Sequence, residues 1–288
     1  MPTKHEKDDI TGIETTGHEW DGIKELNNPL PRWWLWTFYA CILFAVVFWI
    51  LYPSWPTLSG YSKGLLGYSR HAELADEVSA ARSRQAAYLG GIEASSPAEI
   101  MADPDLREFA VSGGRSAFAM HCSQCHGAGA EGGVGYPNLN DDEWVWGGTL
   151  EDIHTTISYG IRADHEDSRE NDMPAFLVDE MLTAAEIAEV AGYVASLSDG
   201  GADVAAAPGA GLYEENCASC HGGAGEGIAE LGAPALNNQI WLYGGDEEAL
   251  IATISNAPRG VMPAWTGRLD EATLKQLTVF VHSLGGGE

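Results

Sequence analysis

One short motif that occurs twice limits what this chain can be more than any other feature. Residues 122–126 (CSQCH) and 217–221 (CASCH) both have the form CxxCH. This spacing is typical of c-type haem attachment, in which two thiols bond the porphyrin and the adjacent histidine binds the iron. We therefore predict two covalently attached haem c groups. The predicted thioether residues are Cys122, Cys125, Cys217 and Cys220, and the predicted proximal iron ligands are His126 and His221.

Three other uses of paired cysteines explain the motifs less well. A structural zinc site draws its four ligands from one compact unit, whereas each pair here stands in its own part of the chain. A thioredoxin-like redox pair needs a βαβ context, and the sequence shows none. Disulfides within each pair would leave both following histidines unexplained. The fifth cysteine, Cys41, lies in an apolar run and is predicted to be a small packing residue.

The chain contains an internal repeat, with one CxxCH motif in each copy. Residues 114–127 align with 209–222, and the similarity continues downstream through matched Trp, Gly-Gly, Thr-Ile-Ser and Met-Pro-Ala elements. Each copy ends in apolar residues spaced as in an amphipathic helix. We predict two tandem helical domains at 108–200 and 209–288, joined by a short linker at 201–208.

A methionine stands at the same place in each copy and is the candidate for the sixth iron ligand. Met173 and Met262 both begin a Met-Pro-Ala element downstream of their CxxCH motif. A thioether suits iron, and Met/His ligation raises the reduction potential. A methionine is more often core filler, but the matched positions favour the ligand, each for the haem of its own copy. His165, in the longer loop of the first copy, is the alternative to Met173.

Arginine is scarce in both acidic copies, yet Arg162 and Arg259 occupy equivalent positions. A haem propionate is a natural partner for such a side chain. An ordinary surface salt bridge is the alternative, and the sequence does not choose between them.

A second constraint is an uncharged apolar stretch near the N-terminus. Residues 33–52 (WWLWTFYACILFAVVFWILY) contain no charged side chain, and twenty helical residues span roughly the ~30 Å hydrocarbon core. Tryptophan and tyrosine at both ends resemble the aromatic belts of membrane helices. We predict one transmembrane helix at 33–52. A buried core helix and a signal peptide, whose apolar core is shorter, are the alternatives.

The overall charge bears on partners. The 288 residues carry 42 acidic and 15 basic side chains, a formal net charge of -27. Nucleic acid is excluded as a partner, because its phosphates require Lys and Arg contacts. Such a surface attracts a basic soluble protein, with an encounter rate that salt lowers.

Together these features predict an all-α chain with one N-terminal transmembrane helix followed by two tandem domains, and each domain resembles the class I cytochrome c fold. Residues 53–107 are predicted to form a linker with helical pieces, including a helix at 72–88, a capping box at Ser96–Glu99 and a helix start at Asp103-Pro104. Because c-type haem is attached outside the cytoplasm, we expect residues 53–288 to be periplasmic and 1–32 cytoplasmic. The chain would be a single-pass protein of the bacterial inner membrane.

Residues 18–39 (HEWDGIKELNNPLPRWWLWTFY), one transmembrane helix, a spacer and two CxxCH domains resemble the CcoP/FixP subunit of cbb-type cytochrome c oxidases. The resemblance covers essentially the whole chain and includes the segments around Met173 and Met262. It implies a subunit that takes electrons from a basic donor cytochrome c and passes them to a monohaem cytochrome c subunit. A separate haem–copper subunit would then reduce oxygen to water while the complex pumps protons. The chain would not be an enzyme by itself.

Other classes of function remain open at this point. The cytochrome subunit of a periplasmic dehydrogenase would have the same two haems. A dihaem peroxidase would need one iron with an open position, which two Met-Pro elements argue against. A gas sensor is a weaker option with the same requirement.

Overall fold

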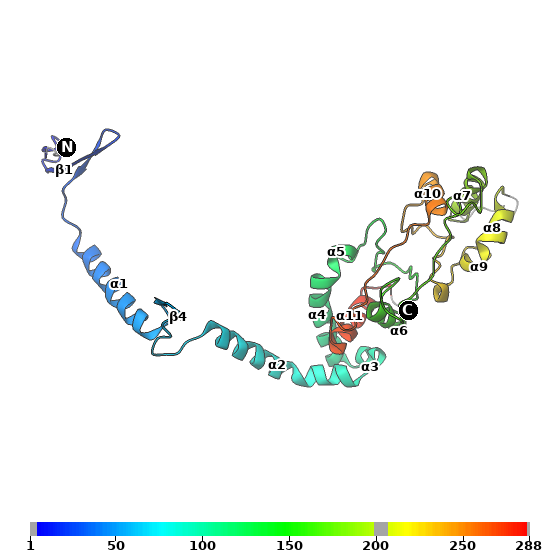
Figure 1. The fold of residues 1–288 in the computed structure, drawn as a ribbon, viewed down its shortest axis with the longest axis horizontal. Coiled ribbons are helices and arrows are strands. Elements are labelled where there is room, and N and C mark those ends of the chain that lie inside the picture. The colour runs from blue at the N-terminus through cyan, green and yellow to red at the C-terminus, as the bar shows by residue number, and fades with distance from the viewer. Residues whose placement is uncertain (1–4, 199–206, 287–288) are drawn as a thin grey trace. The chain divides into compact units, whose positions relative to one another are not determined.

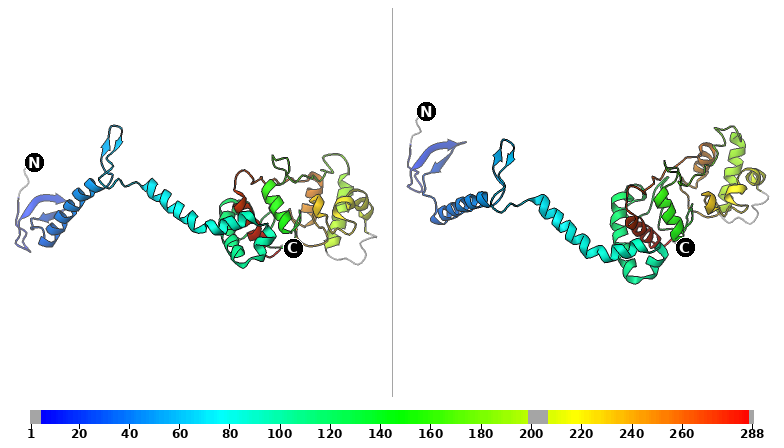
Figure 2. Two further views of the ribbon diagram at one scale, coloured as in Figure 1. Left: turned by 90° about the horizontal axis from the view of Figure 1, so that it is seen from below. Right: turned by 60° about the horizontal axis from the view of Figure 1, so that its bottom comes forward.

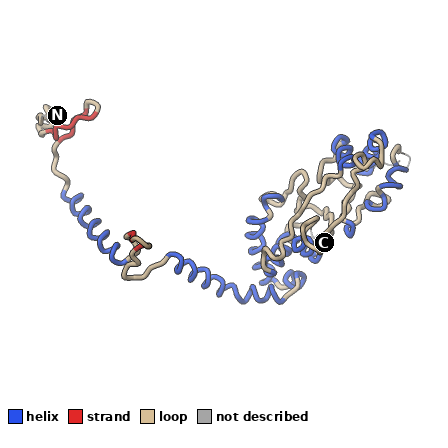
Figure 3. Tube along the Cα trace, viewed as in Figure 1, coloured by secondary structure: helices blue, strands red, loops and turns tan. Residues whose placement is uncertain are grey.

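A computed structural model describes residues 5–198 and 207–286. It divides into two compact units, residues 1–83 and 84–288, and each is described by itself. The predicted linker at 201–208 falls almost wholly outside the described residues. Figure 3 shows that helices dominate and that strands occur only in the N-terminal part of the described chain.

The first unit contains one long apolar helix with a small hairpin on either side of it in the sequence. Strands β1 (Thr15–Trp20) and β2 (Ile23–Leu26) pair antiparallel, then α1 runs over Arg32–Leu51. Strands β3 (Pro56–Thr57) and β4 (Gly60–Tyr61) form the second hairpin. No residue of α1 is buried within the protein, as expected for a helix surrounded by lipid rather than by a soluble core. The sequence predicted this helix to within one residue, and it did not predict either hairpin.

The polar segment after the hairpins is helical, and its boundaries follow local capping signals. Helix α2 (Arg70–Ala94) extends beyond the predicted helix at 72–88. Helix α3 (Pro97–Ala102) begins at the predicted capping box, in which the Ser96 hydroxyl accepts from the Glu99 amide and the Glu99 carboxylate accepts from the Ser96 amide. Helix α4 (Pro104–His121) has Asp103 as its N-cap, at the predicted helix start.

The remaining helices carry the two repeats. In the first copy they are the end of α4, the short α5 (Ser123–His126), α6 (Leu150–Tyr159) and α7 (Ala184–Ser198). In the second they are α8 (Ala210–Asn216), α9 (Ala218–His221), the 3₁₀ turn η2 (Ala229–Leu231), α10 (Glu247–Asn256) and α11 (Glu271–His282). The structure is therefore mostly helical with two tandem copies, as the sequence predicted.

The packing of these helices differs from two self-contained copies, because the copies exchange their last helices. The first core joins Phe118 of α4 and Ile157 of α6 to Leu274 and Phe280 of α11. The second joins Ile187 of α7 to residues of α8 and α10. Figure 1 shows α11, in red, against α4 and α6, and both views of Figure 2 agree. Each core is completed by a helix from the other copy.

The segment between α6 and α7 crosses the segment between α10 and α11, and hydrogen bonds at the crossing hold the exchanged helices in place. The Ile161 amide donates to the Met262 carbonyl at 2.9 Å, and the Met262 amide donates to the Ile161 carbonyl at 3.0 Å. Gly160 precedes this pair with φ +77°, and a Cβ there would lie 2.4 Å from the Met262 carbonyl oxygen. Glycine is required because only it permits both the conformation and the close approach.

Lys275 of α11 fastens the last helix of the chain to the end of α2. Its ammonium donates to the carbonyls of Ile92, Glu93 and Ser95 at 3.3, 2.9 and 2.9 Å. A cation at a helix C-terminus satisfies otherwise unpaired carbonyls and interacts favourably with the helix dipole. The Lys275 side chain is only 12% exposed, so solvent screens these bonds little.

We expect Lys275→Met to lower the free energy of unfolding of residues 84–288 by about 1–3 kcal/mol, the usual range for buried bonds to a charged donor. Methionine keeps most of the apolar stem and removes the ammonium. Chemical denaturation followed by circular dichroism measures the change. An unchanged unfolding midpoint would show that the three bonds do not hold α11 to α2.

Candidate functional site

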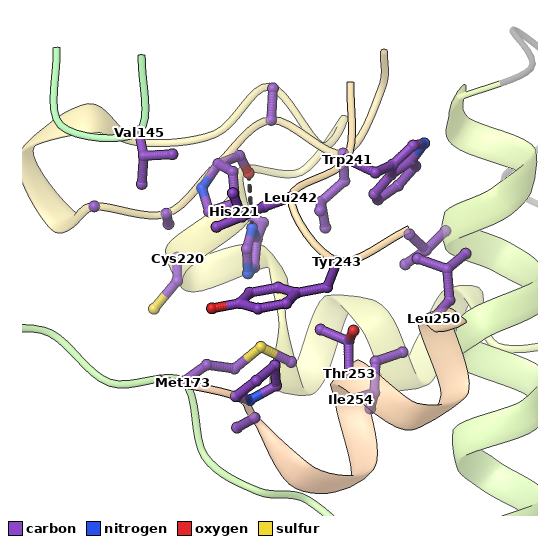
Figure 4. A pocket seen from close by; sticks show the side chains of 18 of the residues that line it. Val145, Met173, Cys220, His221, Trp241, Leu242, Tyr243, Leu250, Thr253 and Ile254 are labelled. Atoms are coloured by element: carbon purple, nitrogen blue, oxygen red, sulfur yellow. Dashed lines mark hydrogen bonds between the residues drawn. The ribbon is translucent and has the colours of Figure 1, made fainter. Parts of the chain in front are cut away.

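The second CxxCH motif lies at the edge of a cavity of about 450 Å³. Cys217 ends α8, and Cys220 and His221 belong to the single turn of α9, so the two sulfurs and the imidazole stand on adjacent turns. Figure 4 shows His221, Tyr243 and Met173 around the same pocket, each on a different segment. Both haem-type thiols, a histidine and a thioether therefore share one largely apolar cavity.

The His221 ring is fixed by its backbone partner. Its Nδ1 lies 2.9 Å from the Pro234 carbonyl oxygen, and His126 has the same arrangement with Pro137 at 3.0 Å. Since a carbonyl only accepts, Nδ1 carries the proton and Nε2 keeps its lone pair. Burial lowers the pKa of both imidazoles, which favours this neutral form at neutral pH. A neutral ring with a free Nε2 is the state that binds a metal.

The cysteines are held in comparable surroundings in the two copies. Burial raises the pKa of the Cys122 and Cys217 thiols to about 11, so both are protonated at neutral pH unless they are bonded. Cys125 and Cys220 are exposed. One half-buried and one exposed sulfur on adjacent turns could reach two points on the rim of a flat macrocycle, whose body would enter the pocket.

The structure places the two methionines with the motifs of the opposite copies. Met173, from the first copy, lines the cavity of Cys217 and His221 and packs against the core formed by α7, α8 and α10. Met262, from the second copy, packs against the core that contains Cys122. We expected each methionine to face the motif of its own copy, and the structure instead places each one with the motif of the other copy. The reason is the exchange of the last helices, since each methionine precedes its exchanged helix in the chain.

The two arginines have different surroundings. The Arg162 Nε donates to the Gly260 carbonyl at 2.7 Å and its Nη1 donates to the Asn171 carbonyl at 3.0 Å, and the side chain lines the same cavity as Met173. Arg259 forms an ion pair with Asp172 at 2.9 Å, with both side chains about half exposed. Arg259 thus makes a surface salt bridge, which the sequence analysis gave as the alternative to a propionate partner. Contact of either arginine with a propionate stays a prediction.

His165, the alternative to Met173, is engaged elsewhere. Its ring contacts that of Tyr159 in a tilted arrangement, with the ring centroids 5.0 Å apart, and its Nδ1 accepts a hydrogen bond from the Asp167 amide at 3.1 Å. The geometry favours Met173.

Two contributions to the site were not identified from the sequence. The carbonyls of Pro137 and Pro234 orient the histidines, and the Pro-X-Leu element common to both copies was a signal that could have identified them. Tyr243 lines the cavity near Met173 and His221. It stands directly before Gly244-Gly245, as Trp146 stands before Gly147-Gly148, so an aromatic residue before the matched Gly-Gly element was a signal that could have identified it.

Comparison with known proteins decides the family. Residues 12–59 match the model described as the N-terminal domain of cytochrome oxidase-cbb3, FixP, and residues 109–194 and 204–281 match that of cytochrome C oxidase, cbb3-type, subunit III. Subunit CcoP of a cbb3-type cytochrome c oxidase from Azospirillum brasilense is 51% identical, covering 98% of this chain and 99% of its own length. Subunit FixP from Rhizobium meliloti (strain 1021) is 50% identical over the full length of both chains.

The chain belongs to the CcoP/FixP family of cbb3-type cytochrome c oxidase subunits. It is accordingly an electron-transfer subunit of the oxidase complex and not the catalytic one, and it binds haem c. Its single apolar helix and this membership indicate a single-pass inner-membrane protein. The resemblance stated from residues 18–39 and the repeat is confirmed.

Proposed function

We propose that this chain is a dihaem electron carrier that relays electrons from a donor cytochrome c to the oxygen-reducing part of the complex. The observation that carries the proposal is the site of His221: thiols, a neutral imidazole and a thioether around one cavity. The residues of the other copy repeat the cysteine and histidine arrangement. When bound, the iron of each haem supplies one-electron transfer.

In this proposal Cys122 and Cys125 hold one haem, and Cys217 and Cys220 hold the other. The iron ligands would follow the exchanged packing, so that His126 and Met262 would hold one iron and His221 and Met173 the other. Two protein ligands on each iron leave no open position for peroxide or a gas, which argues against the peroxidase and sensor alternatives. Arg162 would pair with a haem propionate, a role supported by its side chain lining the same cavity.

The partners follow from charge and family. A net charge of -27 favours a basic donor cytochrome c, and the monohaem and haem–copper subunits of the oxidase would receive the electrons. Oxygen reduction and proton pumping would take place on those other chains. Haem c is attached outside the cytoplasm, so the repeats would be periplasmic and residues 1–32 cytoplasmic.

Isolation of the chain from gently solubilised membranes tests the relay. We expect b-type haem and copper to copurify, and oxygen uptake with reduced cytochrome c to slow as salt is raised, because ions screen the acidic surface. Copurification with a dehydrogenase, and no oxygen uptake, would support the alternative of a dehydrogenase cytochrome subunit and overturn the oxidase relay.

A further inference from the structure

The segment that follows α1 remains uncharged well beyond the end of the helix. No charged residue stands between Arg32 and Lys63, although α1 ends at Leu51. The additional residues include the β3–β4 hairpin, and the large apolar side chains of this hairpin and of the residues on either side of it are exposed. Leu58 at the tip is fully exposed, and Leu65 is 78% exposed. The others are Trp55, Tyr61 and Leu66. A cluster of this kind on a soluble surface marks an interaction site.

The chain after the hairpin folds back onto the last turn of α1. The amides of Leu65 and Leu66 donate to the carbonyls of Ile50 and Leu51 at 2.9 and 3.1 Å. Gly64 makes this approach with φ +68°, and a Cβ there would lie 2.4 Å from the Leu51 carbonyl oxygen. The hairpin is thus tied to the end of the helix.

The fold-back completes the hydrogen bonding of the end of α1. A helix leaves its last four carbonyls without an intrahelical partner. Here the Tyr52 amide bonds the Phe48 carbonyl, the Ser54 hydroxyl bonds that of Trp49, and the two leucine amides bond the remaining pair. In water such carbonyls would be solvated, whereas in lipid each must be satisfied within the protein. The end of α1 is therefore built for surroundings that contain little water.

Aromatic rings gather at the same level. Trp49 of α1 meets Trp55 edge to face at 4.8 Å, and Tyr52 meets Tyr68 at 5.5 Å. Tryptophan and tyrosine prefer the boundary between acyl chains and headgroups, where one part of the ring system is apolar and its polar group is hydrated. Lys63, the first charge after the span, can reach the headgroups on its long stem.

We propose that residues 53–66 form an interfacial membrane anchor, in which Leu58, Leu65 and Leu66 enter the lipid at the acyl–headgroup boundary beside the end of α1. The occupant of this apolar surface is lipid. The hairpin is continuous with the membrane-spanning helix, and the last carbonyls of that helix have hydrogen-bond partners within the protein and so do not need water. The anchor would set the depth of α1 and the point at which the chain leaves the membrane.

Spin labelling of the full chain in its complex, reconstituted into phospholipid vesicles, tests the anchor. Single cysteines replace Leu58, Phe44 in the middle of α1, and exposed Ser79 on α2, each in a Cys41→Ala background, with the unsubstituted background labelled in parallel. Lipid-soluble oxygen and a water-soluble nickel complex then compete to relax the label. We expect the oxygen-to-nickel ratio at position 58 to be several-fold above that at 79 and below that at 44.

Two results would overturn the proposal. Nickel accessibility at 58 equal to that at 79 would place the hairpin in water. Protection from both reagents would place it against another protein chain instead of lipid.

Substitutions at two glycines test whether the hydrogen bonds of Leu65 and Leu66 to the end of α1 fix the position of the hairpin. Gly64 and Gly67 both have positive φ, +68° and +58°, but a Cβ at Gly67 would meet nothing within 4 Å. We expect Gly64→Ala to lower the oxygen-to-nickel ratio at position 58, and Gly67→Ala, which carries the same conformational strain, to leave it near its original value. Equal effects of the two variants would contradict the role given to the hydrogen bonds with Ile50 and Leu51.

Discussion

Replacing Met173 with alanine should change the haem attached at Cys217 and Cys220 and leave the haem at Cys122 and Cys125 as it was. The reason is that Met173 lines the cavity of the second motif although it belongs to the first copy. Loss of the thioether should remove the methionine-to-ferric-iron absorption band of that haem. Its reduction potential should fall by about 0.1 V or more, within the ~0.8 V that axial ligands span.

Two single-haem chains assign the effect. One has alanine at Cys122 and Cys125, and the other has alanine at Cys217 and Cys220, with circular dichroism used to confirm that each is folded. Met173→Ala should abolish the methionine band only in the first chain, and Met262→Ala only in the second. If each substitution instead affected the haem of its own copy, the exchanged ligation would be wrong.

The second large effect concerns the exchanged helices themselves. Leu274 of α11 is 2% exposed and Ile187 of α7 is fully buried, and the two occupy equivalent repeat positions. Truncating either to alanine should lower the free energy of unfolding by about 2–5 kcal/mol through lost burial and a residual cavity. Leu274→Ala should loosen α4 and α6 of the first copy, because Leu274 packs in their core. Ile187→Ala should loosen α8 and α10 of the second.

Hydrogen–deuterium exchange, resolved by segment, measures how fast the amides of each helix exchange in the Leu274→Ala and Ile187→Ala variants. Each variant is the control for the other. Local openings faster than the global one report which helices have lost support. Faster exchange in α8 and α10 after Leu274→Ala, with α4 and α6 unchanged, would show that each copy keeps its own last helix.

The exchange explains why the sequence predicted the parts of the molecule better than their assembly. The CxxCH motifs, the Met-Pro elements and the helix at 33–52 are local signals, and the predicted helix agrees with α1 to within one residue. The choice between α7 and α11 as the partner of α4 is not local. Both helices present a similar apolar face, with Ile187 matching Leu274 and Tyr193 matching Phe280, so their patterns fit either core.

The remaining differences have similar causes. Each strand of the β3–β4 hairpin is only two residues long, too short for the alternation that identifies strands. The arginines were equivalent in the alignment, yet the exchanged connections place Arg162 at a cavity and Arg259 beside Asp172. Repeat equivalence therefore predicted candidate site residues but not the partners that those residues have in the structure.

The relay itself is tested most directly by single-turnover oxidation. The complex containing this chain is fully reduced without air and mixed rapidly with oxygenated buffer, and the c-type haem absorbance is followed alongside that of the chain isolated by itself. The account predicts that both haems of this chain are oxidised within one turnover in the complex and remain reduced far longer in isolation. Equally fast oxidation of the isolated chain, or haems that stay reduced in the active complex, would contradict it.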